Sequence, residues 1–489
     1  MTSRSRSIMG SPQSVRDIPA LTPLERIGPK GYLRYVFPFQ LPADYDVDRV
    51  ASVLRTGYDA AKRQIPVLAC EAVPDVDAKQ TGVLKLQRLT TDDDGEIDDI
   101  VVQDLRAPGA FPLTYTELKA KRFPVSAFDA ELLCRRSVWP SAGERLPVSQ
   151  VQANFIPGGL ILTWCIFHMV GDGASFYTWA QVWAEECRRA QGLEIAEPVR
   201  LPDAIFTDRE RVMRPSGRSS GSLDDHPEYT LLPSTPRGAP PKMLSPDHRG
   251  QVFYFSPAAL AALKAEASPV NATEPSDQPW ISTNDALSAL LWRTVMAVQS
   301  PLDSLQGDPD PVSVFNIAID GRRRTDPPVH PSTLGCFLEY IAVSAPIRQI
   351  LGSASLADLA IRIRRAIRRA DHGPFTDDVV TLIDRLDDVD RLVPTAFLDV
   401  PGFHCVQTSW VDFELYSLDW GPRLGGRIDA VRAPHVGVIN GLQVVLPVLP
   451  DGGVEVLVGV EAGCLDRLLR EPLWTRFAEA SNYMYLSNR

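Results

Sequence analysis

The chain has 489 residues, more than a single hydrophobic core usually organises, so we expect two domains. Hydrophobic residues at 44% and charged residues at 23% are ordinary for a globular protein and exclude wholesale disorder. The formal net charge of -11 gives no electrostatic basis for binding nucleic acid, and the sequence predicts no membrane span, because its most apolar run is shorter than the about 20 residues that a bilayer needs.

The chain opens on a polar segment that carries no secretory signal. Residues 1–17 are rich in Ser and Arg and hold no apolar stretch, so we predict a disordered tail there and a first domain over residues 18–200. The seven cysteines form no C-x-x-C pair and are odd in number, which fits neither a disulfide framework nor a zinc site. The sequence therefore predicts no metal, a reducing compartment and a cytoplasmic location.

Within the first domain, two apolar runs predict a β-hairpin. Val151 to Phe155 and Leu160 to Phe167 are separated by a Pro-Gly-Gly turn signal. The second run leads directly to His168. Bulky apolar residues at helical spacing then predict a helix from an N-cap at Ser175 to about Arg189.

Residues 201–250 carry eight prolines and no apolar periodicity, and are predicted to be a crossover linker without helix or strand. A second domain over residues 251–489 follows. We expect strands at 251–255 and 312–319, helices at 257–267, 284–299, 356–371, 377–386 and 465–484, and a hairpin of 444–449 with 454–460. Strands and helices are mixed throughout, so the predicted fold class is α/β (α+β), in two layered halves.

The segment from His168 to Gly173 is the most informative in the chain. His168 and Asp172 are four residues apart, but Gly171 and Gly173 oppose a helix around Asp172, so we predict a tight loop between strand and helix. A neutral imidazole there can accept a proton from an attacking hydroxyl. Asp172 could fix the ring or could brace the loop by pairing with an arginine, and the spacing does not decide between them. The alternative is a core histidine that bonds to a backbone carbonyl.

The string H-x-x-x-D-G after a buried strand resembles the active-site motif of the BAHD-type acyltransferases, especially the fungal branch related to trichothecene 3-O-acetyltransferase. Further segments follow in that family's order. They are 252–256 with 260–267, 282–293, 320–324 with 327–336, and Ser409-Trp410 followed by Leu418-Asp419-Trp420-Gly421. Two positions depart from the family pattern: Pro422-Arg423 replaces a Trp-Gly pair, and Cys336 stands where Asn is usual.

The resemblance implies two chloramphenicol-acetyltransferase-like domains that meet at an active-site tunnel. It implies that His168 is the general base, that Asp172 braces the loop with Arg322 as a candidate partner, and that Asp419 is mainly structural and paired with an arginine, although it is sometimes regarded as a second catalytic group. Gly173, Trp410 and Trp420, in or beside these motifs, are candidate substrate-binding residues. The donor implied is acyl-coenzyme A (acyl-CoA), a co-substrate held in the tunnel, with no permanently bound cofactor.

The predicted function is transfer of an acyl group from acyl-CoA to a hydroxyl or amine of a small secondary metabolite, by a monomer that binds neither nucleic acid nor membrane. One alternative is a carrier-protein-dependent enzyme of the same superfamily, which Phe167 disfavours because condensation domains usually carry a histidine at that place. Another is a catalytically inactive binding protein. The arginine run at 361–369 could hold CoA phosphates, but its helical spacing favours a solvated face.

Overall fold

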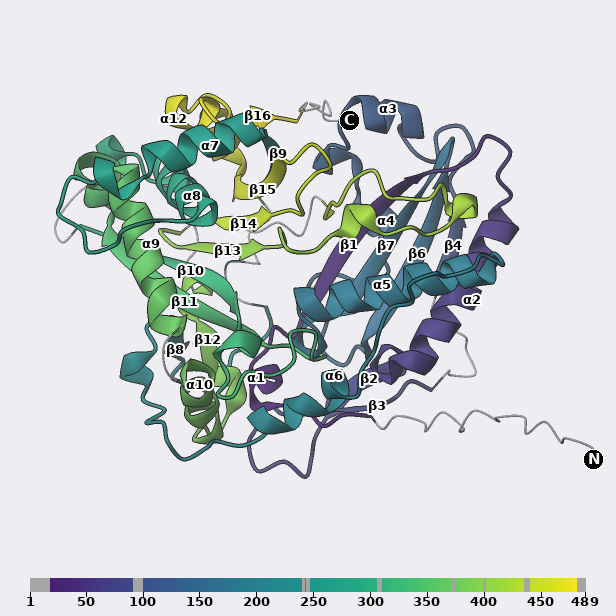
Figure 1. The fold of residues 1–489 in the computed structure, drawn as a ribbon, viewed down its shortest axis with the longest axis horizontal. Helices are drawn as coiled ribbons and strands as arrows, with labels where there is room; N and C mark the ends of the chain where they lie inside the picture. The colour runs from purple at the N-terminus through teal and green to yellow at the C-terminus, as the bar shows by residue number, and fades with distance from the viewer. Residues whose placement is uncertain are drawn as a thin grey trace, which may run out of the picture.

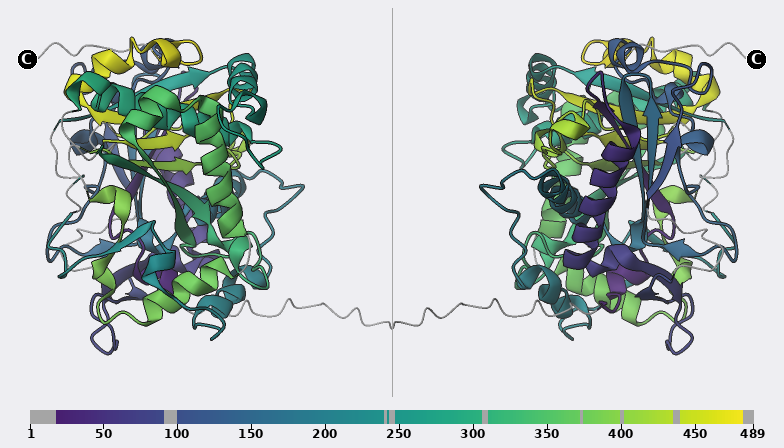
Figure 2. Two further views of the ribbon diagram at one scale, coloured as in Figure 1. Left: turned by 90° about the vertical axis from the view of Figure 1, so that its left-hand side faces the viewer. Right: turned by 90° about the vertical axis from the view of Figure 1, so that its right-hand side faces the viewer.

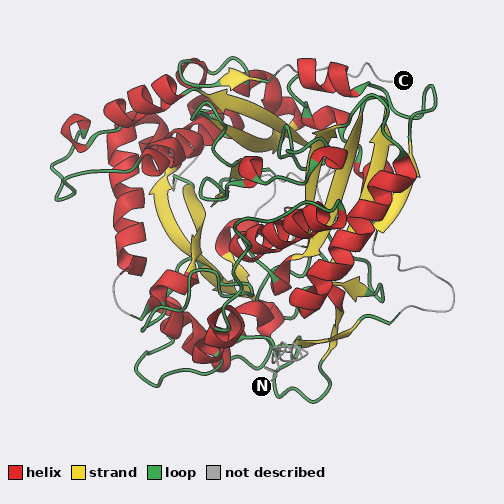
Figure 3. Cartoon of the chain, turned by 45° about the vertical axis from the view of Figure 1, so that its right-hand side comes forward, coloured by secondary structure: helices red, strands yellow, loops and turns green. Residues whose placement is uncertain are grey.

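The computed structural model describes residues 18–90, 100–239, 242, 247–305, 310–371, 374–398, 402–434 and 440–481. The predicted tail at 1–17 lies outside the described residues. Two main sheets, each with helices packed on it, form the two halves of the molecule (Figures 1 and 3). The second-half helices cover one side of the molecule and α2 covers the other (Figure 2). The predicted fold class is confirmed.

The first half contains a four-stranded sheet with the order β1-β7-β6-β4. The predicted hairpin is confirmed, because β6 (Ser149–Ile156) pairs antiparallel with β7 (Gly159–Phe167). On the other side of β7 lies β1 (Tyr32–Gln40), while β4 (Ile100–Asp104) runs parallel to β6. All nine residues of β7 are buried, and His168 begins the short turn that directly follows the strand.

Two helices, α2 (Val47–Gln64) and α5 (Gly173–Ala190), lie side by side over this sheet (Figure 1). Helix α5 buries Phe176, Trp179 and Trp183 at helical spacing, as the sequence predicted. Its predicted N-cap at Ser175 is wrong. The cap is Asp172, whose carboxylate accepts a hydrogen bond from the Ser175 amide, so the helix begins directly after the motif aspartate.

Short elements complete the first half. A three-stranded sheet contains β3 (Leu84–Arg88), β2 (Cys70–Pro74) and β5 (Leu146–Pro147). The short helices are α1 (Pro23–Arg26), α3 (Tyr115–Ala120) and α4 (Ala130–Leu133).

The second half contains a seven-stranded sheet with the order β11-β10-β13-β14-β15-β9-β16. Its strands are β9 (His248–Phe255), β10 (Val312–Asp320), β11 (Leu338–Pro346), β13 (Cys405–Ser409), β14 (Leu442–Val445), β15 (Val454–Glu461) and β16 (Glu479–Ala480). Its longer helices are α7 (Pro257–Glu266), α8 (Thr283–Gln299), α9 (Leu356–Asp371) and α10 (Phe375–Asp384). The predicted second-half helices before the last, and the pairing of β14 with β15, are confirmed within a few residues.

Two predictions about the second half of the chain are wrong. The segment 201–250 contains α6 (Ala204–Thr207) and β8 (Tyr229–Leu231). Strand β8 pairs with β12 (Leu392–Pro394), so a partner distant in sequence stabilises a strand that the segment's own pattern does not predict. The predicted helix at 465–484 is broken. Pro472 starts a new helix after α11 (Ala462–Leu468), and α12 (Pro472–Thr475) gives way to β16.

The two halves are joined by backbone pairing in both directions. From the first half, Thr81 bonds to the 387–389 segment, its N–H donating to Asp387 O at 2.8 Å and its carbonyl accepting from Val389 N at 3.1 Å. From the second half, Arg432 exchanges two backbone hydrogen bonds with Val36 on β1. Each half therefore supplies chain to the surface of the other.

Candidate active site

A cavity of about 1140 Å³ lies between the two halves. The first half contributes the start of β1, the 71–84 segment, the 138–146 segment and His168. The second half contributes residues of β11, β13 and β14 together with Trp410. Much of the wall is apolar, with Leu338, Val406, Leu442, Val444 and Leu457 among its residues. This is the kind of concave, mostly apolar site in which small molecules bind.

His168 lies at the end of β7 and lines this cavity. Its backbone N–H donates to Gly31 O at 2.8 Å, and its ring Nδ1 lies 3.2 Å from Gly171 O. Because a carbonyl oxygen can only accept, Nδ1 carries the proton, and Nε2 is left as the basic nitrogen of the neutral ring. Burial lowers the pKa of His168, opposed in part by hydrogen bonds to backbone carbonyls and by the charge of Asp172. The ring is therefore neutral, and basic at Nε2, at pH 7.

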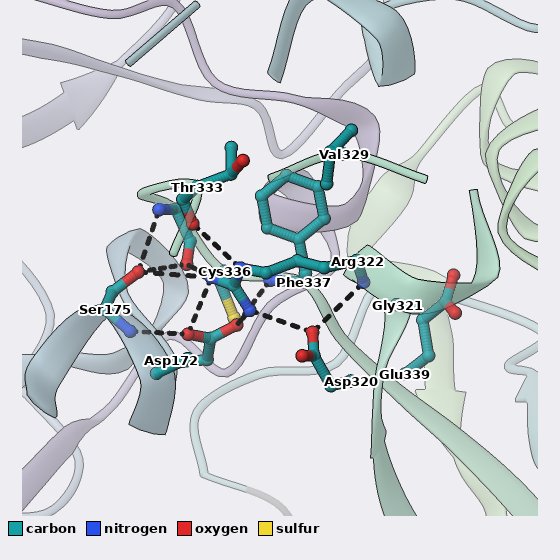
Figure 4. A network of polar contacts seen from close by, with 12 residues as sticks. Asp172, Ser175, Asp320, Gly321, Arg322, Val329, Thr333, Cys336, Phe337 and Glu339 are labelled. Atoms are coloured by element: carbon teal, nitrogen blue, oxygen red, sulfur yellow. Dashed lines mark hydrogen bonds and ion pairs between the residues drawn. The ribbon is translucent and has the colours of Figure 1, made fainter. Parts of the chain in front are cut away.

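Asp172 takes the second of the two roles that its spacing left open. Its carboxylate accepts from Arg322 Nη1 at 2.6 Å and Nη2 at 3.0 Å, from the Ser175 amide at 3.0 Å and from the Phe337 amide at 2.8 Å (Figure 4). Burial raises the pKa of Asp172, but Arg322 and the two amides outweigh it and hold that pKa below its usual value. The acceptor capacity of this carboxylate is thus taken up by groups other than the His168 ring.

Arg322 ties the loop that follows His168 to the second half. It belongs to the turn that follows β10 and its side chain is 1% exposed. Besides Asp172 it contacts Asp320 at 2.9 Å, Thr333 O at 2.8 Å and Gly335 O at 3.1 Å (Figure 4). A buried, bidentate ion pair between the halves thereby fixes the loop that carries His168.

Gly173 and Trp410 both line the cavity. At Gly173 a Cβ would lie 2.5 Å from the Phe413 ring, so only glycine lets the start of α5 pack this closely against the second half. Trp410 packs against Tyr35, with ring centroids 5.2 Å apart. The structure therefore brings His168, Asp172, Gly173 and Trp410 together.

Trp420 and Asp419 lie elsewhere, which corrects the expectation that Trp420 binds substrate. Trp420 is 2% exposed and packs edge-on against Phe39 and Trp183, within the core and outside the cavity lining. Asp419 lies 3.3 Å from Arg188 Nε on α5 and accepts from the Gly421 amide at 2.8 Å. Its contacts hold a loop against α5, away from the cavity.

Asp419→Asn is expected to keep kcat/KM within a few-fold of wild type and to change stability by less than about 1 kcal/mol, because the side chain is 42% exposed and surface ion pairs contribute little. Steady-state kinetics and urea unfolding measure both. Arg188→Met removes the same pair from the other side and is the matched control. A loss of activity of 100-fold or more in Asp419→Asn alone would assign the carboxylate a chemical role.

The arginine run on α9 lies outside the cavity lining. Arg364 pairs with the buried Asp285, Arg365 with Asp277 at 2.6 Å and Arg369 with Glu228 at 3.2 Å. Arg365, Arg368 and Arg369 are exposed, in line with the predicted solvated face. Sequence patterns missed other cavity residues, such as Tyr35, Thr408 and Tyr340, because single aromatic or polar residues in strands carry no distinguishing signal.

In the described part of the chain, no group of three or more His, Cys, Asp or Glu side chains is placed to hold a metal ion. The helices of that same part include none both long and apolar enough to cross a bilayer.

Solved structures share this fold. F. graminearum TRI101 complexed with coenzyme A and deoxynivalenol superposes with a TM-score of 0.80 at 22% identity, over 96% of this chain and 100% of that one. Vinorine synthase superposes with a TM-score of 0.61 at 15% identity, over 97% and 96% of the two chains. The expected two-domain fold is thereby confirmed.

The chain is also similar in sequence to known proteins. The eremophilane O-acetyltransferase of Penicillium rubens is 28% identical, over 93% of this chain and 97% of that protein. A Penicillium crustosum protein named enoyl-CoA isomerase/hydratase is also 28% identical, over 93% of this chain, but the chain spans only 50% of its length.

Fold, site and relatives together define an acyltransferase with two layered domains. Residues 116–463, more than half of the chain, match the protein family described as "Transferase family". Residues 32–187 match the family described as "Trichothecene 3-O-acetyltransferase-like N-terminal domain". The chain belongs to the Transferase family, and the resemblance that its motifs indicated is confirmed.

Proposed function

We propose that this chain transfers an acyl group from acyl-CoA to a hydroxyl of a small secondary metabolite, with His168 as the general base. The observation that carries the proposal is the neutral His168 ring, held through Nδ1 by Gly171 O at 3.2 Å, in a cavity lined by both halves. The names of relatives support an oxygen acceptor, and the coenzyme A bound to TRI101 supports the donor.

The size of the cavity supports the simultaneous binding of both substrates. Ligand sites commonly enclose about 300–1000 Å³ for one molecule, and this cavity has about 1140 Å³. We propose that donor and acceptor meet there directly, without a covalent acyl-enzyme. The apolar wall favours an acceptor that is largely hydrocarbon and carries the reacting hydroxyl.

The proposed reaction uses His168 in two steps. Nε2 takes the proton of the acceptor hydroxyl as the oxygen attacks the thioester carbonyl, and the resulting tetrahedral oxyanion collapses with loss of the thiolate. The imidazolium then protonates that thiolate. Asp172 and Arg322 hold the loop, while Gly173 and Trp410 are proposed to contact the substrates.

We also propose that the protein is cytoplasmic and acts as a monomer. The seven cysteines, all described, form no disulfide, which fits a reducing cytoplasm. Both walls of the cavity come from one chain, so a monomer has a complete site.

Release of free thiol from a panel of acyl-CoA donors, with hydroxylated terpenoid or polyketide acceptors, tests this function. We expect release that saturates with acceptor and returns to the background hydrolysis rate when the acceptor lacks its hydroxyl. A matched carrier-bound acyl thioester serves as the second donor. Release from the carrier-bound donor alone would contradict acyl-CoA and favour a carrier-dependent enzyme.

A further inference from the structure

A second buried ion pair supports the 334–337 turn, the turn that precedes β11. Glu25 on α1 and Arg209 are both buried, and Arg209 Nη2 donates to Glu25 Oε2 at 2.5 Å. The same guanidinium donates to Ala20 O at 2.8 Å and to Leu334 O at 3.2 Å. The pair therefore joins three segments that lie far apart in the sequence.

The other oxygen of the Glu25 carboxylate holds the turn itself. Oε1 accepts a hydrogen bond from the Cys336 amide at 3.2 Å. The neighbouring Gly335 has a φ of +138°, and a Cβ there would lie 2.8 Å from Oε1, closer than a side-chain carbon can approach. A glycine at this position is what lets the carboxylate reach the backbone of the turn.

The same turn binds the residues that hold the catalytic loop. Gly335 exchanges two hydrogen bonds with the Ser175 hydroxyl, its N–H donating at 2.9 Å and its carbonyl accepting at 2.8 Å. The Phe337 amide donates to the Asp172 carboxylate at 2.8 Å (Figure 4). A shift of this turn would therefore shift Asp172, and with it the loop that begins at His168.

The chain after Glu25 also reaches His168 directly. The Glu25 carbonyl accepts from the Gly28 amide at 3.0 Å, and a Cβ on Gly28 would lie 3.0 Å from the Cα of Met169. Three residues further on, Gly31 O accepts from the His168 amide at 2.8 Å. The segment that leads away from α1 thus packs on the backbone of the catalytic histidine and its neighbour.

We propose that Glu25 is a positioning residue for His168. Its buried carboxylate, paired with Arg209, fixes the 334–337 turn and the start of the segment after α1, and these two contacts set the place of the His168 ring in the cavity. Neither Glu25 nor Arg209 lines the cavity, so the pair acts on the base and not on the substrates. The inference rests on the proposed function, because it takes His168 as the base.

Glu25→Gln tests the role, because it keeps the shape of the side chain and removes its charge. An amide NH₂ in either oxygen position would face an N–H donor, from Cys336 on one side or from Thr22 and Arg209 on the other. We expect kcat to fall about 10- to 100-fold, and KM to stay within about threefold of wild type, because the base is displaced while the substrate contacts remain.

The matched control is Glu455→Gln. It breaks another buried ion pair, between Glu455 and Arg432, and neither of these residues lines the cavity. We expect this variant to lose stability and to keep the wild-type kcat.

The place of the ring is measured by NMR of the full-length protein labelled with ¹⁵N-histidine, in which His168→Ala identifies the His168 signals. We expect the His168 ring signals to shift in Glu25→Gln and to match wild type in Glu455→Gln. This measurement needs no substrate. A failure to find acyl transfer would therefore be distinguishable from a failure of the positioning role.

Unshifted His168 signals in folded Glu25→Gln would overturn the proposal, and so would an equal loss of kcat in Glu455→Gln. If Glu25→Gln does not fold, Arg209→Lys replaces it in the same measurement. Lysine keeps the positive charge but lacks the planar fork that bonds to Glu25, Ala20 O and Leu334 O together. Shifted His168 signals are expected in that variant, and unshifted signals would equally overturn the proposal.

Discussion

Replacing His168 by alanine is expected to lower kcat/KM for acyl transfer by about 10²- to 10⁴-fold, the usual contribution of general-base help. The change removes the basic Nε2 from the cavity, while the Asp172–Arg322 pair that holds the loop remains. Stopped-time assays of thiol release measure the loss, and the melting temperature reports whether the fold is kept. His330→Ala, outside the cavity lining, is the matched histidine control and should keep wild-type activity.

The pH profile of the wild-type enzyme tests the role of the His168 ring independently. Burial lowers the pKa of His168 below its ordinary 6.5, and the base acts only when neutral. We therefore expect kcat/KM to be flat around pH 7 and to fall as the pH drops through a value below 6.5. Activity within tenfold of wild type in His168→Ala, or an acid limb centred above pH 7, would contradict the assignment.

Arg322→Met is expected to destabilise the protein by about 3–5 kcal/mol, because it leaves the Asp172 carboxylate buried without its cation. The 1% exposed guanidinium also bonds to Thr333 O and Gly335 O, so the turn on the second half loosens with it. Urea unfolding midpoints measure the effect. Arg218→Met, which breaks an exposed pair with Asp326, is the matched control and should cost less than about 1 kcal/mol.

The pH dependence of stability follows from the same pair. The folded-state pKa of Asp172 is depressed, so the pair stabilises the protein above the unfolded pKa of about 3.9 and that stability is lost as the pH falls through the lower, folded value. The gap between wild type and Arg322→Met should therefore narrow below about pH 4. A variant as stable as Arg218→Met at neutral pH would show that the ion pair does not hold the halves together.

The sequence predicted what local pattern determines. Apolar alternation and a Pro-Gly-Gly turn defined the hairpin that ends at His168, and the helical spacing of Phe176, Trp179 and Trp183 defined α5. Arg322 as partner of Asp172 came from family resemblance, and no local pattern would have found it across 150 positions.

Tertiary context decided the rest. Trp410 and Trp420 are ten residues apart in similar motif surroundings, yet one lines the cavity and the other fills the core, because only the meeting of the two halves distinguishes their environments. Helix α5 begins after Asp172 and not after Ser175, and the Asp172 carboxylate both caps it and pairs with Arg322.

Backbone hydrogen bonds join the two halves at two places, between Thr81 and the 387–389 segment and between Arg432 and Val36. These bonds constrain how such proteins can be recombined. A chimera that joins the first half of one relative to the second half of another must match two crossing strands of chain as well as the Asp172–Arg322 contact. Substrate range in this architecture is therefore easier to alter by changing individual cavity residues than by swapping whole halves.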